Sequence, residues 1–561
     1  MTKLNGSEIL LECLLEQGVD TIFGYPGGAV LNIYDALYKY RDKIRHILTS
    51  HEQGASHAAD GYARSSGKVG VCLATSGPGA TNFVTGISTA YMDSSPVVAI
   101  TGNVARPLLG KDSFQEIDIT GVTLPITKHN FIVKDIDDLA ETVRRAFYIA
   151  QEGRPGPVLI DVTKDVTAAI GQYEYKVPDI IDRAKHKPAE NDIVCAVELI
   201  KNSKKPVVVA GGGLISSGAA KEFRTFVEKI DAPVALTAMG LGGFSSDDAR
   251  CTGMLGMHGT RASNLAVMDC DLLVALGVRF SDRVTGDTKT FAEKAKIIHI
   301  DIDPAEINKN VEVYCPVVGD LSYALEELNK RLDNQAHGDW MSKIAQLKAQ
   351  HPLKYKTDGN GLCPQYVIQK IGEITKGEAI ITTDVGQHQM FSCLYLPHKY
   401  PRHMITSGGL GTMGFGLGAS IGAAVANPDK TVINITGDGC FRMNNIELAT
   451  AVANNVPVIV VIMNNHVLGM VRQWQNFFYG QRYSHTTFGQ SSESVDFVKL
   501  AEAYHTAAFN VSSVDEVEPA IKAALELKKP VVINVEMGAD DKVFPMIPSG
   551  DRIDHFWNED E

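Results

Sequence analysis

The stretch TVINITGDGCFRMNNIELATAVANNVPVIVVIMNN, residues 431–465, decides the fold. It opens with an apolar run typical of a buried strand, which ends at Gly437-Asp438-Gly439. A helical pattern follows, and a second apolar run ends at Asn464-Asn465. Two parallel strands joined by a helix place both turns at the same carboxyl edge of a sheet, where ligands bind. The stretch therefore predicts a strand–helix–strand unit that brings Asp438 and Asn465 together.

These two side chains carry the kind of oxygen that binds magnesium. Mg²⁺ takes a few protein oxygens and completes its octahedron with water and phosphate. The glycines on either side of Asp438 would let backbone N–H groups approach phosphate oxygens at the start of a helix. We therefore predict a cation and diphosphate site here. The plain alternative is an Asp-Gly turn and an Asn cap in an ordinary α/β domain.

Similar Val/Ile-rich runs, each followed by a Gly-rich turn and a helical pattern, recur along the chain. They predict an α/β protein of three domains, each a mostly parallel sheet flanked by helices, which together look like three versions of one plan. The expected domains are 1–180, 190–335 and 360–545, followed by a C-terminal tail at 546–561, with polar linkers at 171–192 and 334–361. The expected strands lie at 69–75, 96–102, 157–163, 206–213, 233–240, 271–277, 296–303, 379–386, 431–439, 456–465 and 530–536.

The composition argues against nucleic-acid-binding, secreted and membrane-spanning classes of protein. The chain has 561 residues and a net charge of −13, without the basic patch that nucleic-acid binding requires. We see no signal peptide, and no run reaches the ~18 apolar residues of a membrane span. The nine cysteines are dispersed and form no CxxC pair. This pattern is typical of a reducing compartment, so we expect a cytoplasmic protein that binds neither nucleic acid nor membrane.

The stretch at 431–465 resembles the cofactor motif of thiamine-diphosphate-dependent enzymes. The resemblance implies the three-domain fold of that family, with Asp438, Asn465 and the backbone carbonyl of Val467 as Mg²⁺ ligands. It implies contacts to thiamine diphosphate from Gln387 and His388, which lie in DVGQHQM, and from Gly411, Met413, Gly437, Gly439 and Cys440. Cys440 replaces the serine that is more usual in the GDGS form of the motif.

Thiamine chemistry needs a well-placed carboxylate beside the aminopyrimidine ring, and HILTSHEQGASHAADGYAR (46–64) supplies Glu52. The HEQGA context resembles that of the family's catalytic glutamate. Taken alone, Glu52 could be an exposed residue at a helix start. The loops GYPGGAV (24–30) and ATSGPGATN (74–82) resemble those that line the pyrimidine side, which implies Pro26, Gly28, Pro78 and Asn82. In this family the two halves of the site meet across a subunit interface, which implies a homodimer or homotetramer.

Further motifs resemble the acetohydroxyacid synthase family over essentially the whole chain. They are FQE…ITKHN within 111–130, GVRFSDRVTG (277–286), GGLGTMGFGL (408–417) and LGMVRQWQ (468–475). The resemblance implies decarboxylation of pyruvate and ligation of the two-carbon unit to a second 2-ketoacid, pyruvate or 2-ketobutyrate, at the first common step of branched-chain amino-acid biosynthesis. Arg283 would bind the acceptor carboxylate and Trp474 would favour 2-ketobutyrate, with Phe114, Gln115, Lys164, Met413 and Met470 lining the site. A surface ion pair for Arg283 and core packing for Trp474 and Met470 are the plain alternatives.

The expected second domain contains the segment PVVVAGGGLISSGAAKEF, which has a glycine turn between a strand and a helix. The turn does not match GxGxxG cleanly, so taken alone it is weak evidence for a dinucleotide site. The RFxDR box resembles that of the FAD-binding synthases, although Ser281 replaces the usual Asp and puts the local geometry in doubt. The implied FAD contacts are Arg154, Gly211, Gly212, Gly213, Met257, His258, Gly277, Arg279, Arg283, Asp301, Ile302 and Asp320. Because the reaction has no net redox step, the flavin would be structural. An empty dinucleotide domain is the alternative.

Three other functions are weighed against this interpretation. Pyruvate oxidase and catabolic acetolactate synthase are thiamine enzymes, but Arg283 and Trp474 argue against both, and the catabolic enzymes lack the RFxDR box. A non-catalytic paralogue would not need Glu52, Asp438 and Asn465 together. A small regulatory subunit is a possible partner that the sequence leaves open.

Overall fold

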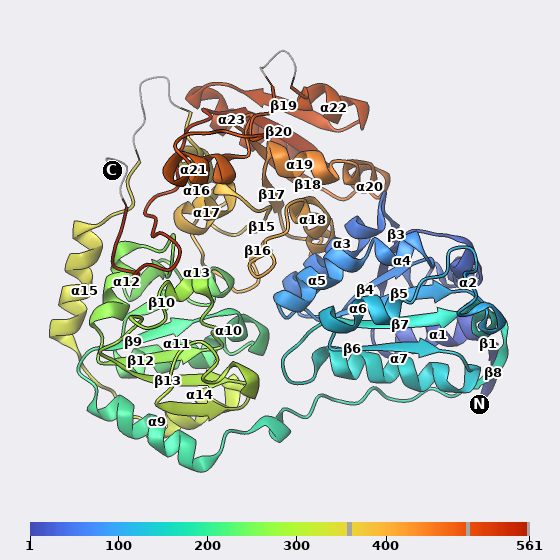
Figure 1. Cartoon of the computed structure of the whole chain (residues 1–561), viewed down its shortest axis with the longest axis horizontal. Helices are drawn as coiled ribbons and strands as arrows, with labels where there is room; N and C mark the ends of the chain where they lie inside the picture. The colour runs from blue at the N-terminus through green and yellow to red at the C-terminus, as the bar shows by residue number, and fades with distance from the viewer. Residues whose placement is uncertain (356–361, 490–493, 558–561) are drawn as a thin grey trace.

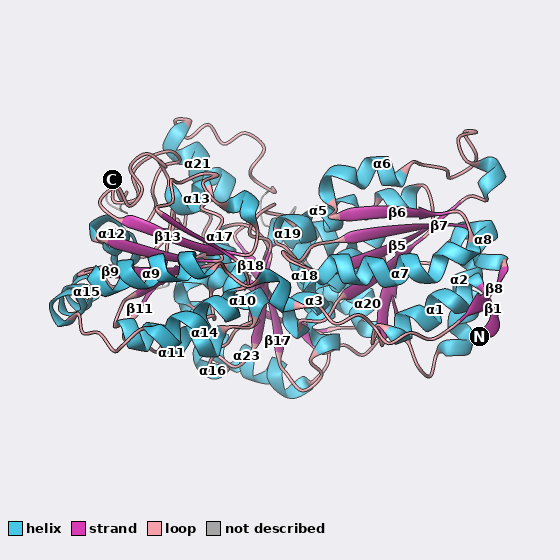
Figure 2. Ribbon diagram, turned by 90° about the horizontal axis from the view of Figure 1, so that it is seen from below, coloured by secondary structure: helices cyan, strands magenta, loops and turns pink. Residues whose placement is uncertain are grey.

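The computed structural model describes residues 1–355, 362–489 and 494–557 and contains three six-stranded parallel sheets. Each sheet has helices on its faces, so the expected α/β class is confirmed (Figures 1 and 2). A two-stranded antiparallel ribbon of β1 (Thr2–Asn5) and β8 (Ile170–Tyr173) closes the first domain. The expected linker at 334–361 and tail at 546–561 lie partly outside the described residues.

The first sheet has the order β3-β2-β4-β5-β7-β6. Its strands are β2 (Thr21–Gly24), β3 (Arg45–Leu48), β4 (Gly70–Ala74), β5 (Val97–Asn103), β6 (His129–Val133) and β7 (Val158–Thr163). Its helices are α1 (Gly6–Glu16), α2 (Leu31–Tyr40), α3 (Glu52–Ser66), α4 (Pro78–Thr81), α5 (Val84–Met92), α6 (Ile119–Thr123), α7 (Ile136–Gln151) and α8 (Lys164–Ala168). Helices α1, α2 and α7 share a core on one face, whereas α3, α5 and α6 cover the other.

The middle sheet has a different order, β11-β10-β9-β12-β13-β14. Its strands are β9 (Pro206–Ala210), β10 (Val234–Leu236), β11 (Cys251–Met254), β12 (Leu272–Leu276), β13 (Lys296–Asp301) and β14 (Cys315–Val318). Its helices are α9 (Glu190–Asn202), α10 (Gly212–Ser217), α11 (Ala220–Ile230), α12 (Arg261–Asp269), α13 (Asp282–Thr285), α14 (Leu321–Arg331) and α15 (Gly338–Gln350). The C-terminal segment returns to this domain, where Ile547 and Ile553 join the same core as Trp340 of α15 (Figure 1).

The third sheet has the order β16-β15-β17-β18-β20-β19. Its strands are β15 (Ile380–Thr383), β16 (Met404–Thr406), β17 (Val432–Gly437), β18 (Val458–Asn464), β19 (Ala507–Val511) and β20 (Val531–Glu536). Its helices are α16 (Pro364–Ile374), α17 (Gln387–Tyr395), α18 (Phe415–Ala426), α19 (Asp438–Asn444), α20 (Glu447–Ala453), α21 (Gly469–Phe478), α22 (Phe497–Ala503) and α23 (Val514–Leu527). Where the sequence predicts a single helix between β17 and β18, the structure has two, α19 and α20.

The outer sheets share one topology. Numbered within its own domain, each has the strand order 2-1-3-4-6-5, whereas the middle sheet has 3-2-1-4-5-6. The expected duplication of one plan therefore holds for the first and third domains, and the middle domain is built differently. Each order has a point beside its first strand where consecutive strands switch from one side of the sheet to the other, and ligands bind beside such a point.

The outer domains pack against each other through α3 and α18. Glycines allow this close approach, because a Cβ on Gly61 would lie 2.1 Å from the carbonyl oxygen of Ala419. A Cβ on Gly422 would lie 1.8 Å from the carbonyl oxygen of Ala58. Helix α3, which begins at Glu52, is thus held directly against α18 of the third domain.

All nine cysteines are free thiols, so no disulfide framework is present. Within the described ranges no helix combines the length and the apolar character needed to cross a membrane.

Candidate functional site

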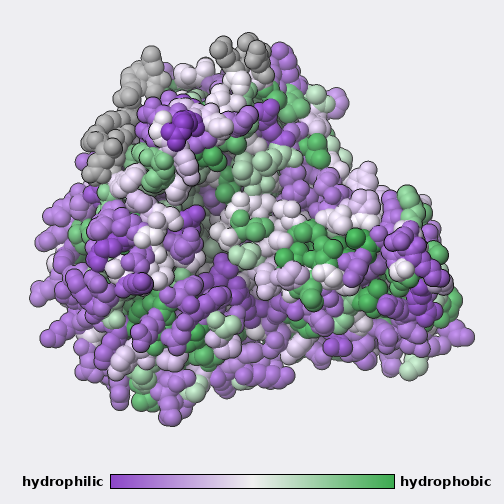
Figure 3. All heavy atoms as spheres, viewed as in Figure 1, coloured by the Kyte–Doolittle hydropathy of each residue, from purple (hydrophilic) through white to green (hydrophobic). Residues whose placement is uncertain are grey.

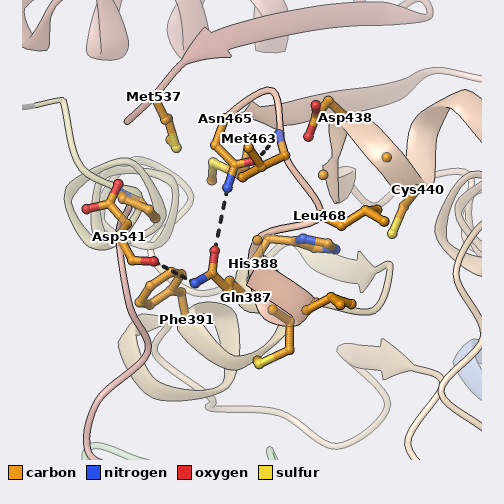
Figure 4. Close-up of a pocket in the computed structure, with 18 of the residues that line it drawn as sticks. Gln387, His388, Phe391, Asp438, Cys440, Met463, Asn465, Leu468, Met537 and Asp541 are labelled. Carbon is orange, nitrogen blue, oxygen red and sulfur yellow. Dashed lines mark hydrogen bonds between the residues drawn. The ribbon is translucent and has the colours of Figure 1, made fainter. Parts of the chain in front are cut away.

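The candidate diphosphate site lies at the carboxyl edge of the third sheet, where β15 and β17 flank the reversal of strand order. Its pocket is lined by residues from the loops after β15, β17 and β18 (Figure 4). The sequence-predicted residues that the structure brings together here are Gln387, His388, Met413, Gly437, Asp438, Gly439, Cys440, Asn465, Val467 and Met470. The unit at 431–465 therefore forms the expected arrangement.

Asp438 is the only charged member of the predicted cation ligands, and its side chain is buried. Burial raises the pKa of this carboxyl to about 7, against the hydrogen bond from the Gly439 amide, which lowers it. A bound divalent cation would offset that cost of ionisation, so the burial fits a cation site. Across the described residues no group of three or more His, Cys, Asp and Glu side chains is placed to hold a metal. The candidate site instead combines one carboxylate with amide and carbonyl oxygens, as Mg²⁺ accepts.

His388 and Gln387 form the opposite wall of the pocket. Burial lowers the pKa of His388 to about 3, so its ring is neutral, and its Nε2 is buried without a hydrogen-bond partner. Gln387 donates from Nε2 to Gln473 at 2.9 Å and to the carbonyl of Asp541 at 2.6 Å. His388 lines the pocket, and the single N–H of a neutral imidazole suits an acceptor such as a diphosphate oxygen.

The backbone near this wall has no room for larger residues. A Cβ on Gly469 would lie 2.1 Å from Oε1 of Gln387, and one on Gly437 would lie 3.0 Å from Nδ1 of His388. Gly469 and Gln473 were not predicted as site residues, although both belong to the recognised LGMVRQWQ segment. Gln473 acts on the pocket through its hydrogen bond to Gln387, and only the three-dimensional contact reveals this.

The candidate acid, Glu52, lies at the carboxyl edge of the first sheet. It is the first residue of α3, is partly buried, and accepts a hydrogen bond of 2.9 Å from Nδ2 of Asn82. The loop that contains Pro78 lies against it, because a Cβ on Gly79 would be 3.2 Å from Oε1 of Glu52. Gln115 closes over the same loop, 2.9 Å from a Cβ on Gly77. These contacts orient the Glu52 carboxylate.

The other predicted residues of the first domain follow strands at this same edge. Pro26 and Gly28 follow β2, and Lys164 follows β7 directly; all three are exposed. Phe114 is 88% exposed, far more than its apolar ring favours in an isolated chain. The structure thus gathers these residues at one edge but does not enclose them.

The two candidate halves do not meet within one chain. The described residues that line the pocket around Asp438 all belong to the third domain, and Glu52 is not among them. A site that uses both Glu52 and Asp438 therefore needs a second chain to supply one of the two residues.

A second cavity, of about 570 Å³, opens at the carboxyl edge of the middle sheet. The sequence-predicted flavin residues that line it are Arg154, Gly212, Gly213, Met257, His258, Gly277, Arg279, Arg283, Asp301 and Ile302. An adjoining cavity shares Gly212, Gly213, Gly277, Asp301 and Ile302 and continues to Asp320. The two form one elongated space, which fits an extended dinucleotide better than a small ligand. Gly211 lies behind the lining, where a Cβ would be 2.3 Å from the carbonyl of Gly277.

The polar groups of this elongated cavity are held by contacts between domains. Arg154 of the first domain donates to Glu306 at 2.7 Å and to Asp303 at 3.1 Å. Burial lowers the pKa of His258 to about 4, so this ring is neutral. Arg183 and His186, from the expected linker at 171–192, line the far end near Asp320. No pattern in the sequence predicts that the linker reaches a cavity.

The candidate acceptor residues lie at the opposite end of the flavin cavity. Arg283, Met470 and Trp474 all line it, although they belong to different domains. The Arg283 side chain is 59% exposed and lies 3.2 Å from Asp282, so it forms a surface ion pair while facing the cavity. Trp474 packs against Phe478 with ring centroids 5.0 Å apart. Ser281 lines the cavity too, and Gly411 lines it rather than the diphosphate pocket.

The described cavities contact one another at the third domain. Val385, Gly386 and Met470 line both the diphosphate pocket and the flavin cavity. A reaction centre between them would therefore have the cation site on one side and Arg283 with Trp474 on the other.

Comparisons with known proteins identify the family of each domain. Family models of thiamine pyrophosphate (thiamine diphosphate) enzymes match all three domains. The N-terminal TPP binding domain matches residues 4–122, the central domain 193–328 and the C-terminal TPP binding domain 384–535. Each matched segment contains one of the six-stranded sheets or most of it.

Relatives that match over nearly the full length identify the subgroup within this family. The chain is 48% identical to the probable acetolactate synthase large subunit of Methanocaldococcus jannaschii, over 98% of this chain and 94% of that protein. It is 44% identical to the acetolactate synthase large subunit of Haemophilus influenzae, over 97% and 96%. It is 47% identical to the chloroplastic acetolactate synthase of Arabidopsis thaliana, over 97% and 83%. The chain therefore belongs to the acetolactate synthase large subunits, within the thiamine pyrophosphate enzyme family.

Proposed function

We propose that this acetolactate synthase ligates two 2-ketoacids at a site made of Glu52 from one protomer and the Asp438 pocket of another, with Mg²⁺ and a structural FAD. The observation that carries the proposal is the gathering of the predicted residues into two adjoining cavities. Glu52, which neither cavity contains, supplies the acid–base group.

The residues around Asp438 would hold the cofactor's diphosphate through a divalent cation. Asp438, Asn465 and the carbonyl of Val467 would bind the cation, while neutral His388 and Gln387 would contact phosphate oxygens. When bound, thiamine diphosphate supplies a carbon nucleophile and an electron sink for decarboxylation of a 2-ketoacid. The chain's contribution is orientation and exclusion of water from a buried pocket.

Glu52 would bond to the aminopyrimidine ring and pass a proton to and from it. Asn82 fixes the carboxylate for this task through the 2.9 Å hydrogen bond. A group that transfers protons must lie within hydrogen-bond reach of its partner before its pKa matters. The loop around Pro78 and Gly79 restricts the position of Glu52 on its other side.

The acceptor 2-ketoacid keeps its carboxylate, and Arg283 would bind it. The guanidinium presents paired donors that match a carboxylate. Trp474, on the same cavity, would contact the acceptor's alkyl group and favour 2-ketobutyrate over pyruvate by the ~1–3 kcal/mol that one methylene is worth. Met470 lies between this end and the diphosphate pocket.

The elongated cavity of the middle domain would hold FAD. The glycine turn at Gly212 and Gly213 opens α10, where backbone N–H groups suit a diphosphate. The ligation has no net redox step, so we assign the flavin a structural role at the wall of the active site.

A symmetric dimer is proposed because an apolar face near Glu52 is exposed to solvent. Figure 3 shows apolar side chains gathered on this face of the first domain. Tyr91 and Met92 of α5 and Val122 of α6 are 39%, 36% and 42% exposed. A two-fold contact would cover such a face and bring each Glu52 to the other protomer's pocket. Because several relatives are named large subunits, we also propose a small regulatory partner.

The reaction can be tested by incubating the chain with pyruvate and 2-ketobutyrate, Mg²⁺ and thiamine diphosphate, with and without FAD. We expect both 2-acetolactate and 2-aceto-2-hydroxybutyrate to form, as scored by mass spectrometry. Chelation of the cation or omission of thiamine diphosphate should remove both products. Oxygen consumption with pyruvate and no acetohydroxy acid would instead identify an oxidase.

A further inference from the structure

The side chain of Asp93, which directly follows α5, is fully buried where all three domains meet. One carboxylate oxygen accepts a hydrogen bond of 2.7 Å from the backbone amide of Gly409. The other accepts from the amide of Gly408 at 3.0 Å and from Arg64 at 3.1 Å. A residue of the first domain thus holds a glycine loop of the third domain by charge-assisted hydrogen bonds.

Arg64 completes a buried ionic network around Asp93. It bonds to both oxygens of Asp60, at 2.7 and 2.8 Å, and donates to the carbonyl of Thr406 at 2.7 Å. Burial lowers the pKa of Arg64, but the charges of Asp60 and Asp93 outweigh it and raise that pKa overall. Breaking such a network leaves an uncompensated buried charge, so the network holds its geometry firmly.

The middle domain joins the same point through Arg279. Its guanidinium donates to the carbonyl of Met92, the residue before Asp93. Its Nη2 would lie 3.1 Å from a Cβ on Gly409. Arg279 and Asp93 both line the flavin cavity, so the Asp93 junction forms part of the cavity wall.

The loop that Asp93 holds reaches both candidate cofactor sites. Residues 408–411 line the flavin cavity, and Met413 lines the diphosphate pocket. Thr412, between them, is held by a 2.7 Å bond between its hydroxyl and that of Thr89. Gly411 has a φ of +72°, in the left-handed region that glycine adopts readily. Fixing a glycine in one conformation costs more backbone entropy than fixing any other residue.

We propose that Asp93 is a positioning residue that couples the two cofactor sites through residues 408–413. The inference rests on the proposed binding of FAD. Because Asp93 and Arg64 hold the loop as one rigid unit, a ligand that positions one end of the loop also positions the other end for the second ligand. Asp93 is required for this coupling because its buried carboxylate holds the loop that reaches both cofactor sites. Coupling between sites is reciprocal by thermodynamic necessity.

Isothermal titration calorimetry can measure the coupling directly. The dissociation constant of thiamine diphosphate with Mg²⁺ is measured with and without saturating FAD, and the reciprocal titration is performed. For the wild-type chain we expect each cofactor to tighten the other by about fivefold or more. In Asp93→Asn, which presents an amide to the amides of Gly408 and Gly409, both cofactors should bind more weakly and the tightening should vanish.

The matched control is Asp271→Asn. Asp271 also accepts from two successive backbone amides, those of Lys204 and Lys205 at 2.8 and 2.9 Å, and lines neither cofactor cavity. It should keep the wild-type coupling. Thr89→Val removes the bond to Thr412 and a local helix bond to the carbonyl of Thr85, and it leaves Asp93 intact. It is a milder variant in case Asp93→Asn does not fold, and it should reduce the tightening to less than half.

The outcomes separate the inference from the proposed function. Wild-type chain that binds both cofactors independently, or Asp93→Asn and Thr89→Val with unchanged coupling, would overturn the role of Asp93 alone. Wild-type chain that binds no flavin would overturn the flavin site and, with it, the coupling.

Discussion

Replacing Glu52 by Gln is expected to lower the rate of acetolactate formation by about 10³-fold, within the range of a lost acid–base group. Gln is nearly isosteric with Glu and its carbonyl oxygen can still accept the hydrogen bond from Asn82. Thiamine diphosphate should therefore bind with nearly unchanged affinity, because the diphosphate pocket belongs to another domain. Steady-state rates and calorimetric titration would separate the two effects.

A matched control is Glu190→Gln. Glu190 also stands at the first residue of a helix, α9, but lies away from both candidate cavities and pairs with Arg331. This variant should keep its activity. Near-normal turnover in Glu52→Gln would refute the assigned role of Glu52.

Replacing Asp438 by Asn is expected to weaken Mg²⁺-dependent binding of thiamine diphosphate by at least about 100-fold. Even residues outside the first coordination sphere of metal sites contribute 10–100-fold to affinity, and Asp438 is the only carboxylate among the proposed ligands. Activity should fall with the affinity and recover in part at high cofactor and Mg²⁺ concentrations.

Binding of FAD in the absence of thiamine diphosphate provides the internal control for Asp438→Asn. It should remain at the wild-type affinity, because Asp438 does not line the flavin cavity. An unchanged affinity for thiamine diphosphate would contradict the assignment of Asp438 as a cation ligand.

Much of the fold could be predicted because the inner strands are continuous apolar runs. In the middle and third sheets all the inner strands, such as β12 and β18, coincide with runs that the sequence marks. The edge strands β11, β14, β16 and β19 were not predicted, because they are short and pair on one side only. The separate strand order of the middle sheet depends on pairing between distant segments, which no local pattern encodes.

The candidate site likewise contains residues that the sequence predicts and residues that it does not. The Asp438 unit could be predicted because one strand–helix–strand segment carries both halves of the cation site. The role of Asp93 could not, since its partners Gly408 and Gly409 are 315 and 316 residues away in sequence. The linker residues Arg183 and His186 are polar and surrounded by polar sequence, so only their position at the cavity reveals them.

The central claim, a site that combines Glu52 of one protomer with Asp438 of another, is tested most directly by mixing two inactive variants. Glu52→Gln and Asp438→Asn chains are unfolded and refolded together. Acetolactate formation is then measured at cofactor and Mg²⁺ concentrations that saturate an intact site but leave a site with Asp438→Asn empty. Random mixing makes half of the symmetric dimers heterodimers, each with one intact site, so about a quarter of wild-type activity should return. If each site lay within one chain, every site would carry a substitution and the mixture would remain as inactive as either variant alone.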